Sequence, residues 1–476
     1  MIEESVFKLS ITEVALRIKS REISPVELTE TALTRLDRLQ PKLNSFITIL
    51  AEQAMAQAKE RERELIQGKY RGPLHGIPIG LKDNLATAGI QTTIGSKIFK
   101  GNIPAEDAFV VERVKEAGAI ILGKENLHEF AMGVSSNNPH FGAVHNPWDP
   151  DCVPGGSSGG SAANVAACLT FASLGSDAGG SVRTPASVCG VVGLKPTYGR
   201  VSQRGLLSSN FGHDHVGPIT RSVADSALML GVIAGHDPMD ATSAEVPVPR
   251  HTVKGYRLKS LRMGIPKNYY FEQLDPEVES AVKQAVDALS NMGIEPVEVE
   301  LPSLQYALIL RIISAAENLV AHENLIRTHR ADYGQDVLYR MLPTQFMTAG
   351  DLARCFKVQR VIIDDFSRAL EEADFLVAPT TPIPAYPIKA KTVSVKGKEL
   401  PTVGPGRSAS LLGRNCYVTN HTGNPSLSVP CGFTVGGLPI GLQLIGRPFE
   451  EGLLFRVAGC YEQTSPARGK QPAVAG

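Results

Sequence analysis

Residues 169–196, LTFASLGSDAGGSVRTPASVCGVVGLKP, indicate both the fold and the chemistry of this chain. Two short apolar runs, which end at Gly175 and Lys195, flank a loop rich in glycine. This pattern predicts two buried strands connected through that loop. The loop presents Ser181 directly after two glycines, and a serine in such a bare setting is a candidate nucleophile. No histidine lies within thirty residues on either side, so another group must accept its proton.

The same pattern of short apolar runs extends along most of the chain. Further apolar runs end at Lys82 and Lys124, and helix-like segments such as DAFVVERVKEAG and SAANVAACLTFA lie between the runs. Strands that alternate with helices predict an α/β fold whose sheet carries helices on both faces. Sites in such sheets lie at strand ends, and Lys82 and Ser181 both fall at such positions.

No linker divides the chain, so we expect a single domain over residues 1–476. Residues 1–70 are expected to be largely helical, because Ser24-Pro25-Val26-Glu27 supplies an N-cap, a proline at the first helical position and an acid in the first turn. Residues 71–230 contain the candidate catalytic groups. Residues 231–476 would complete the sheet and the substrate pocket, and the final TSPARGKQPAVAG is expected to fray.

Composition excludes several classes of function. Forty-eight basic residues balance forty-eight acidic ones, so no surplus charge would attract nucleic acid directly or an anionic membrane surface. Apolar stretches are interrupted before 18 residues, and the N-terminus does not resemble a signal peptide. Seven scattered cysteines favour a reducing cytoplasm. His213 and His215 flank Asp214 without further ligands at a metal spacing, so we expect neither a metal nor another cofactor.

Two well-known motifs are matched only in part. The run from Gly118 to Lys124 has the spacing of a phosphate-binding loop, but Glu125 stands where that loop needs Ser or Thr. We therefore interpret this segment as the end of a buried strand. Residues 156–160, GSSGG, have the spacing of a nucleophile elbow, but the preceding HNPWDPDCVPG is polar and broken by proline rather than a hydrophobic strand.

Lys82 is the first candidate for the missing base. It closes the apolar run IPIGL, and burial lowers the pKa of a lysine, which makes a neutral amine available near neutral pH. The alternative is a lysine whose stem is buried and whose ammonium reaches water. The second candidate is the serine pair in PGGSSGG, which could also be a tight turn before a helix that begins near Ser161.

These segments together resemble the amidase signature family. GLKDN, PGGSSGG, GSDAGGSVRTPA and CGVVGLKPTYGRVS carry the resemblance, and the 24 residues from Ser157 to Ser181 match the family's spacing. It continues through HVGPITRSVADSA, VAPTTP, NPSLSVPCGF and GLPIGLQLIGRPF, and so covers nearly the whole chain. The resemblance implies an α/β fold with a large mixed, mostly parallel sheet.

The resemblance also implies roles for individual residues. Ser181 would attack the amide carbonyl, Ser157, held by a cis peptide from Gly156, would relay the proton, and Lys82 would accept it. The oxyanion hole would consist of the backbone amides of Ala178, Gly179, Gly180 and Ser181. The residues that support this loop without entering the proton path would be Asp177, Arg183 and Ser158. The family's commonest GTDTGGS reads GSDAGGS here, so Ala178 lacks a hydroxyl without loss of a backbone amide.

Three functions remain open at this point. The preferred hypothesis is a cytoplasmic amidase that hydrolyses a linear amide through an acyl-enzyme, with only a small-molecule amide as partner and a homodimer as one option. The first alternative is the glutaminase component of a Glu-tRNA(Gln) or Asp-tRNA(Asn) amidotransferase, known as its A subunit. A non-catalytic binding scaffold is the second alternative.

Two residues bear on the choice of substrate. Arg340 falls near the family's arginine for the glutamine carboxylate, and Met132 is expected to line the pocket. The family's acid for the glutamine amine is missing, because the matching stretch LLGRNCYVTNHTGNP has Gly413 and Arg414 there. This absence is the reason for preferring less polar amides.

Overall fold

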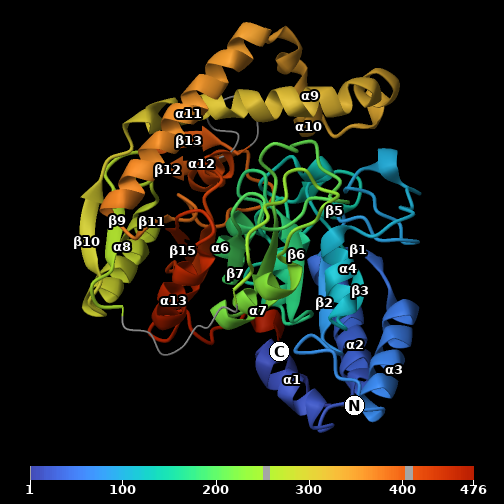
Figure 1. The fold of residues 1–476 in the computed structure, drawn as a ribbon. Helices are drawn as coiled ribbons and strands as arrows, with labels where there is room; N and C mark the ends of the chain where they lie inside the picture. Colours follow the sequence, from blue (N-terminus) through green and yellow to red (C-terminus); the bar gives the residue numbers. More distant parts are fainter. Residues whose placement is uncertain (1, 250–257, 403–410, 476) are drawn as a thin grey trace.

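The computed structural model describes residues 2–249, 258–402 and 411–475. Its centre is one mixed sheet of 11 strands, drawn as arrows in Figure 1. From one edge to the other the strands are β1 (Phe46–Ile49), β3 (Ile120–Glu125), β2 (Pro78–Lys82), β6 (Ala172–Ser176), β8 (Val216–Thr220), β7 (Val192–Lys195), β14 (Ser426–Phe433), β15 (Pro439–Ile445), β11 (Phe375–Pro379), β9 (Arg262–Pro266) and β10 (Glu295–Val299).

The sheet confirms the predicted large mixed α/β architecture. Its parallel strands form two blocks, β3-β2-β6 and β11-β9-β10, and the strand pairs between these blocks are antiparallel. The short runs 78–82, 120–125, 172–176 and 192–195 are all strands with every residue buried. The motif at residues 118–124 is therefore a strand end, as the sequence predicts.

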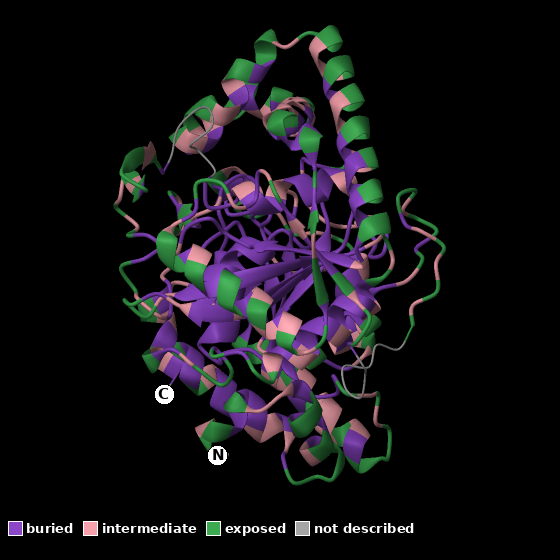
Figure 2. Cartoon of the chain, turned by 90° about the vertical axis from the view of Figure 1, so that its left-hand side faces the viewer, coloured by how far each residue is buried: buried purple, intermediate pink, exposed green. Residues whose placement is uncertain are grey.

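Helices cover both faces of this sheet. In Figure 2 the central strands are buried, whereas the surrounding helices alternate between buried and exposed faces. The helices packed closest to the central strands are α5 (Gly159–Ala166), α6 (Arg183–Cys189), α7 (Val223–Ile233), α8 (Pro276–Asn291) and α13 (Glu451–Glu462). All residues of α5 and α6 are buried, as expected for helices in the core of a large protein.

The N-terminal region is mostly helical, as predicted. Its helices are α1 (Ile11–Lys19), α2 (Pro25–Leu43) and α3 (Ala51–Ile66), and α4 (Phe109–Glu116) follows β2. Ser24 caps α2 by accepting hydrogen bonds from the amides of Val26 and Glu27. The sequence did not predict β1, a four-residue edge strand between α2 and α3.

A group of helices forms the top of the molecule in Figure 1 and extends over both halves of the sheet. It contains α9 (Leu310–His329), α10 (Gln335–Met341), α11 (Ala349–Glu372) and, closer to the sheet, α12 (Arg414–Thr422). Within the described residues, one helical stretch, Pro302–Asp332, is long and apolar enough to span a membrane by length and composition alone. It packs against α11, and the sequence analysis did not expect such a stretch.

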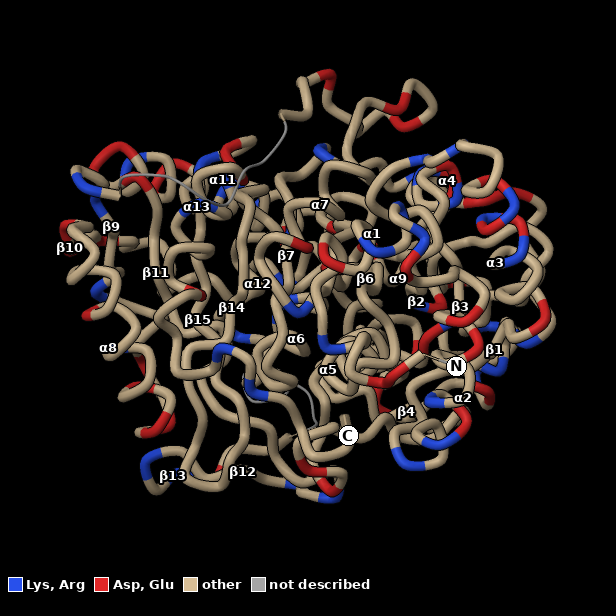
Figure 3. The backbone as a smooth tube through the Cα atoms, turned by 90° about the horizontal axis from the view of Figure 1, so that it is seen from below, with Lys and Arg blue, Asp and Glu red and all other residues tan. Residues whose placement is uncertain are grey.

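The remaining elements are short. They are the strand pairs β4 (Asn137–Asn138) with β5 (Gly142–Ala143) and β12 (Thr392–Val395) with β13 (Lys398–Pro401), and the 3-10 helices η1 (Glu4–Lys8), η2 (Lys97–Phe99), η3 (Glu129–Ala131), η4 (Pro302–Ile309), η5 (Arg330–Asp332), η6 (Leu342–Phe346) and η7 (Ala473–Ala475). Acidic and basic residues are interspersed around the molecule in Figure 3, in agreement with the balanced composition.

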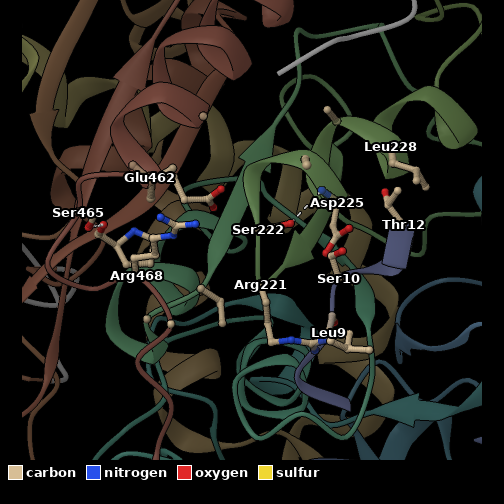
Figure 4. Close-up of a pocket in the computed structure, with 18 of the residues that line it drawn as sticks. Leu9, Ser10, Thr12, Arg221, Ser222, Asp225, Leu228, Glu462, Ser465 and Arg468 are labelled. Carbon is tan, nitrogen blue, oxygen red and sulfur yellow. Dashed lines mark hydrogen bonds between the residues drawn. The ribbon is translucent and has the colours of Figure 1, made fainter. Parts of the chain in front are cut away.

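The C-terminal tail packs against the body, so the prediction of a frayed tail is wrong. The carbonyl of Ala475 accepts a hydrogen bond of 3.1 Å from the buried guanidinium of Arg35. The tail also lines a surface cavity of about 1980 Å³ together with α1, α7 and α13 (Figure 4). Figure 4 shows Arg221, Asp225 and Glu462 in its wall, whereas Lys82, Ser157 and Ser181 do not line it.

Candidate active site

Lys82 ends strand β2 with its side chain completely buried. Its ammonium nitrogen donates a hydrogen bond of 2.7 Å to Oγ of Ser157 and one of 2.8 Å to Oγ of Ser176. A further contact of 3.5 Å reaches the carbonyl of Ser176. The side chain therefore does not reach water, and the interpretation of Lys82 as a lysine with a solvated ammonium is wrong.

The buried setting determines the protonation of Lys82. Removal of the ammonium from water lowers its pKa from 10.5 to about 7, although Asp214 and Asp177 act in the opposite direction. A substantial fraction of the side chain is therefore a neutral amine at neutral pH, which can accept a proton from the hydroxyl of Ser157.

Ser157 and Ser158 lie in the turn before α5. The peptide bond from Gly156 to Ser157 is cis, and both serines are fully buried. The carbonyl of Ser157 accepts hydrogen bonds from the amide of His128 and from the hydroxyl of Ser136. Ser158 has a different orientation: its hydroxyl donates to the carbonyl of Ser176, and its amide donates over 3.2 Å to the carbonyl of Ser181. The structure thus brings the serine pair next to both Lys82 and the loop of Ser181.

Ser181 lies between β6 and α6, and 9% of its surface is exposed. The amide of Gly180 donates a 2.7 Å hydrogen bond to the Asp177 carboxylate, so this amide is already engaged. The amides of Ala178, Gly179 and Ser181 have no acceptor among the residues that the structure describes. These three amides are the available donors among the four that the sequence analysis assigned to an oxyanion hole.

Asp177 and Arg183 form a buried ion pair that holds the loop. The Arg183 guanidinium donates two hydrogen bonds of 2.9–3.0 Å to the carboxylate of Asp177. Although burial opposes it, the charge of Arg183 holds the pKa of Asp177 well below its usual range. The same guanidinium donates to Thr419 and Asn420 of α12. Both residues therefore support the loop of Ser181 from its buried side, in the role that the sequence predicts.

Helix α12 supports the loop directly, and apart from Arg414 its residues were not singled out from the sequence. Asn420 donates to both the carbonyl and the carboxylate of Asp177. A Cβ atom at Gly179 would lie 2.9 Å from the ring of Tyr417, and one at Gly180 would lie 2.5 Å from Cβ of Cys416. Both glycines are thus required by the close approach of α12. The polar Asn420 inside VTNHTGNP was the only available sequence signal for this contact.

The histidine pair at 213 and 215 belongs to the surrounding hydrogen-bond network. His215 donates from Nδ1 to the carbonyl of Asp177, and its Nε2 accepts from Lys195. Burial lowers the pKa of His215 well below its ordinary value, which favours this neutral form. His213 contacts Ser314 of α9 instead. Among the described residues no cluster of three or more potential ligands could hold a metal ion.

Met132 and Arg340 are associated with helix α10. Met132 follows η3 and packs in an apolar cluster that includes Val337 and Met341 of α10. Arg340, also on α10, keeps a buried Nε without a hydrogen-bond partner among the described residues. Burial lowers the pKa of Arg340, and the carboxylate of Asp336 opposes that shift. An unpaired guanidinium of this kind is suited to bind an anionic group of a ligand.

Comparison with known proteins identifies the family. The Amidase family model matches residues 27–455. The chain belongs to the amidase signature family. It is 40% identical to the A subunit of glutamyl-tRNA(Gln) amidotransferase from Carboxydothermus hydrogenoformans, over 98% of this chain and 99% of the relative. Membership in this family makes the chain an enzyme of the amidase type.

Solved structures agree with this assignment. The A subunit of the Thermotoga maritima glutamyl-tRNA(Gln) amidotransferase superimposes with a TM-score of 0.82 at 33% identity, over 100% of this chain and 99% of that one. A protein described as part of a vestigial complex, related to the origins of an s-triazine catabolic enzyme, superimposes with a TM-score of 0.91 at 31% identity. That match covers 97% of this chain and 100% of the other.

These relatives correct one prediction. The sequence analysis expected only a small-molecule amide as partner, no direct nucleic acid and at most a second copy of the chain. Relatives that match this chain over nearly its full length are named as one subunit of a glutamyl-tRNA(Gln) amidotransferase. A balanced net charge could not reveal this, because it reports the whole surface and not a binding face.

Proposed function

We propose that the chain is the amide-hydrolysing component of an amidotransferase, and that it releases ammonia from glutamine at Ser181. The main observation in support of this chemistry is the 2.7 Å hydrogen bond from the buried Lys82 to Ser157. The lowered pKa of Lys82 agrees with its role as a base. The extent and level of identity to amidotransferase relatives support the choice of glutamine. The unpaired guanidinium of Arg340 supplies a partner for the glutamine carboxylate.

The reaction would proceed in two halves. The oxygen of Ser181 attacks the amide carbonyl while its proton passes through the hydroxyl of Ser157 to the neutral amine of Lys82. Backbone amides of Ala178, Gly179 and Ser181 stabilise the oxyanion. The C–N bond then breaks, the nitrogen takes a proton back along the same path, and ammonia leaves an ester on Ser181. Water attacks that ester with the same base, and the acid and Ser181 are regenerated.

A second candidate is favoured by one observation. Gly413, the N-cap residue of α12, stands where the family carries an acid for the glutamine amine, and the adjacent Arg414 contacts Glu272 and Tyr269 instead. An amidase for amides that lack an amino group would need no such acid. This candidate uses the same catalytic residues and differs only in the substrate.

Ammonia release from a panel of amides tests the proposal. The purified chain is expected to release ammonia from L-glutamine, and Ser181→Ala is expected to abolish release from every amide while it retains the fold. Release from acetamide or benzamide but not from glutamine would favour the second candidate. A wild-type chain that releases no ammonia and does not react with a fluorophosphonate at Ser181 would be a non-catalytic scaffold.

A further inference from the structure

We propose that Asp336 binds the α-ammonium group of the substrate beside Arg340, which binds its carboxylate. The inference rests on the proposed glutamine-hydrolysing function and names the residue that replaces the missing acid at position 413. The ligand it predicts is an α-amino-acid amide in its zwitterionic form. Three observations support this assignment. Helix α10 carries opposite charges, it is connected to the serine pair, and the carboxylate of Asp336 is ionised.

Asp336 and Arg340 are four residues apart on α10, so they lie on the same face of the helix. The two charges are close enough to shift each other's pKa, but they are not within ion-pair distance of one another. Arg340 makes no hydrogen bond with the described residues. The helix therefore presents a negative and a positive group side by side without using one to neutralise the other.

His128 connects this pair to the catalytic centre. Its backbone amide donates a 3.1 Å hydrogen bond to the carbonyl of Ser157, and its Nε2 donates a 2.8 Å hydrogen bond to the carboxylate of Asp336. The carboxylate is thus one side chain away from the proton-relaying serine. The amide of Ser158, the next residue, donates to the carbonyl of Ser181, so α10 is linked through His128 and the serine pair to the loop of the nucleophile.

The carboxylate of Asp336 is suited to an ammonium. Hydrogen bonding from His128 and the charges of His128 and Arg340 outweigh burial and lower its pKa to about 2, so it is ionised at neutral pH. His128 occupies one oxygen, and the side chain remains 22% exposed. A charge-assisted hydrogen bond from an ammonium to a partly buried carboxylate is stronger than a neutral one.

Charge balance makes the site selective. A zwitterion brings a cation to Asp336 and an anion to Arg340, so every charge is paired. Glutaramate is glutamine without its amino group, so it would bring a carboxylate near Asp336 and no cation to balance the two negative charges. We therefore expect the wild-type chain to prefer glutamine to glutaramate, even though position 413 carries no acid.

The ratio of kcat/KM for L-glutamine to kcat/KM for glutaramate, measured by ammonia release, tests this assignment. Asp336→Asn is expected to reduce this ratio by roughly 10- to 100-fold, through the KM for glutamine and with kcat largely retained. Asp332→Asn is the matched control, because Asp332 lies four residues earlier in the chain, at the end of η5, and pairs with Lys97 at the surface. It should leave both substrates unchanged. Introduction of Gly413→Asp into the Asp336→Asn variant should restore part of the ratio.

Each outcome supports or overturns the assignment. If Asp336→Asn lowers kcat equally for both substrates and leaves the ratio unchanged, Asp336 is only a support for His128 and the assignment is overturned, while the proposed function stands. If the wild-type chain hydrolyses glutaramate as well as glutamine, no ammonium is recognised and the assignment is also overturned. If the wild-type chain releases no ammonia from glutamine, both the proposed function and the assignment of Asp336 are overturned.

Discussion

Two neighbouring strands of the sheet carry a lysine at or next to their last position, and the two lysines have different environments. Lys82 ends β2, and Lys124 is the last but one residue of β3, which runs parallel to β2 and pairs with it. Both side chains are completely buried. In the sequence they look alike, because each follows a short apolar run and precedes an acid, in GLKDN and GKEN.

The difference lies in what surrounds each ammonium. Lys82 contacts the hydroxyls of Ser157 and Ser176, which are neutral. Lys124 donates to the carbonyl of Leu85 and to two threonine hydroxyls, and it lies 3.8 Å from the carboxylate of Asp83. Burial lowers the pKa of both: to about 7 for Lys82, where the charges of Asp214 and Asp177 oppose the shift, and to about 8 for Lys124, where Asp83 opposes it.

This contrast shows that a buried lysine near the end of a strand can have either of two roles, depending on its neighbours. Neutral hydroxyl partners allow Lys82 to lose its proton, and one of them belongs to a serine that needs a base. The carboxylate of Asp83 favours the charged form of Lys124, and the hydrogen bond from Lys124 to the carbonyl of Leu85 fixes the turn after β2. The contrast predicts that removal of Lys82 affects catalysis and that removal of Lys124 affects stability.

The largest expected effect is on the rate of Lys82→Met. Loss of the base should reduce kcat for glutamine by about 10²- to 10⁴-fold, the usual contribution of general base catalysis. The melting temperature should not fall, because methionine fills the space of the lysine side chain. Methionine also avoids the cost of removing an amine from water, which the wild-type chain incurs when Lys82 is buried. Steady-state ammonia release and a thermal melt measure the two quantities on the same sample. A Lys82→Met chain with near-normal turnover would contradict the assignment of the base.

Lys124→Met is the matched variant, and its expected effect is on stability. It leaves the carboxylate of Asp83 buried without its cation, and breaking such a pair costs about 3–5 kcal/mol of unfolding free energy. Urea unfolding at pH 7 measures this loss. The double variant Lys124→Met with Asp83→Asn should recover most of it, since no charge remains. If Lys124→Met is as stable as the wild type but inactive, the two lysines have been assigned the wrong way round.

The sequence predicted much of this site, and the reason lies in local patterns. Strand ends, glycine-rich loops and the spacing of Ser157 and Ser181 are encoded in short stretches, and their resemblance to one family assigned Lys82 as well. The contacts of Asn420 and Asp336 were not accessible, because α12 and α10 reach the site from more than 150 residues away in the chain. The environments of Lys82 and Lys124 also depend on tertiary contacts, although their partners are nearer in the chain, 75–94 residues away for Lys82 and 32–39 for Lys124.

The smallest effect that separates the two lysines is the pH dependence of the rate. The pKa of Lys82 is lowered to about 7, so the amine is protonated and inactive as a base below that pH and neutral above it. We therefore expect kcat/KM for glutamine to rise about tenfold per pH unit below pH 7 and to level off above it. Lys124→Met should keep this limb at the same pH, since Lys124 takes no part in the proton path. Two results would contradict this assignment: a rise of kcat/KM that shifts to another pH in Lys124→Met, or no rise at all in the wild type between pH 5 and 9. Either result would mean that the rate does not depend on the protonation of Lys82, and that Lys82 does not accept the proton from Ser157.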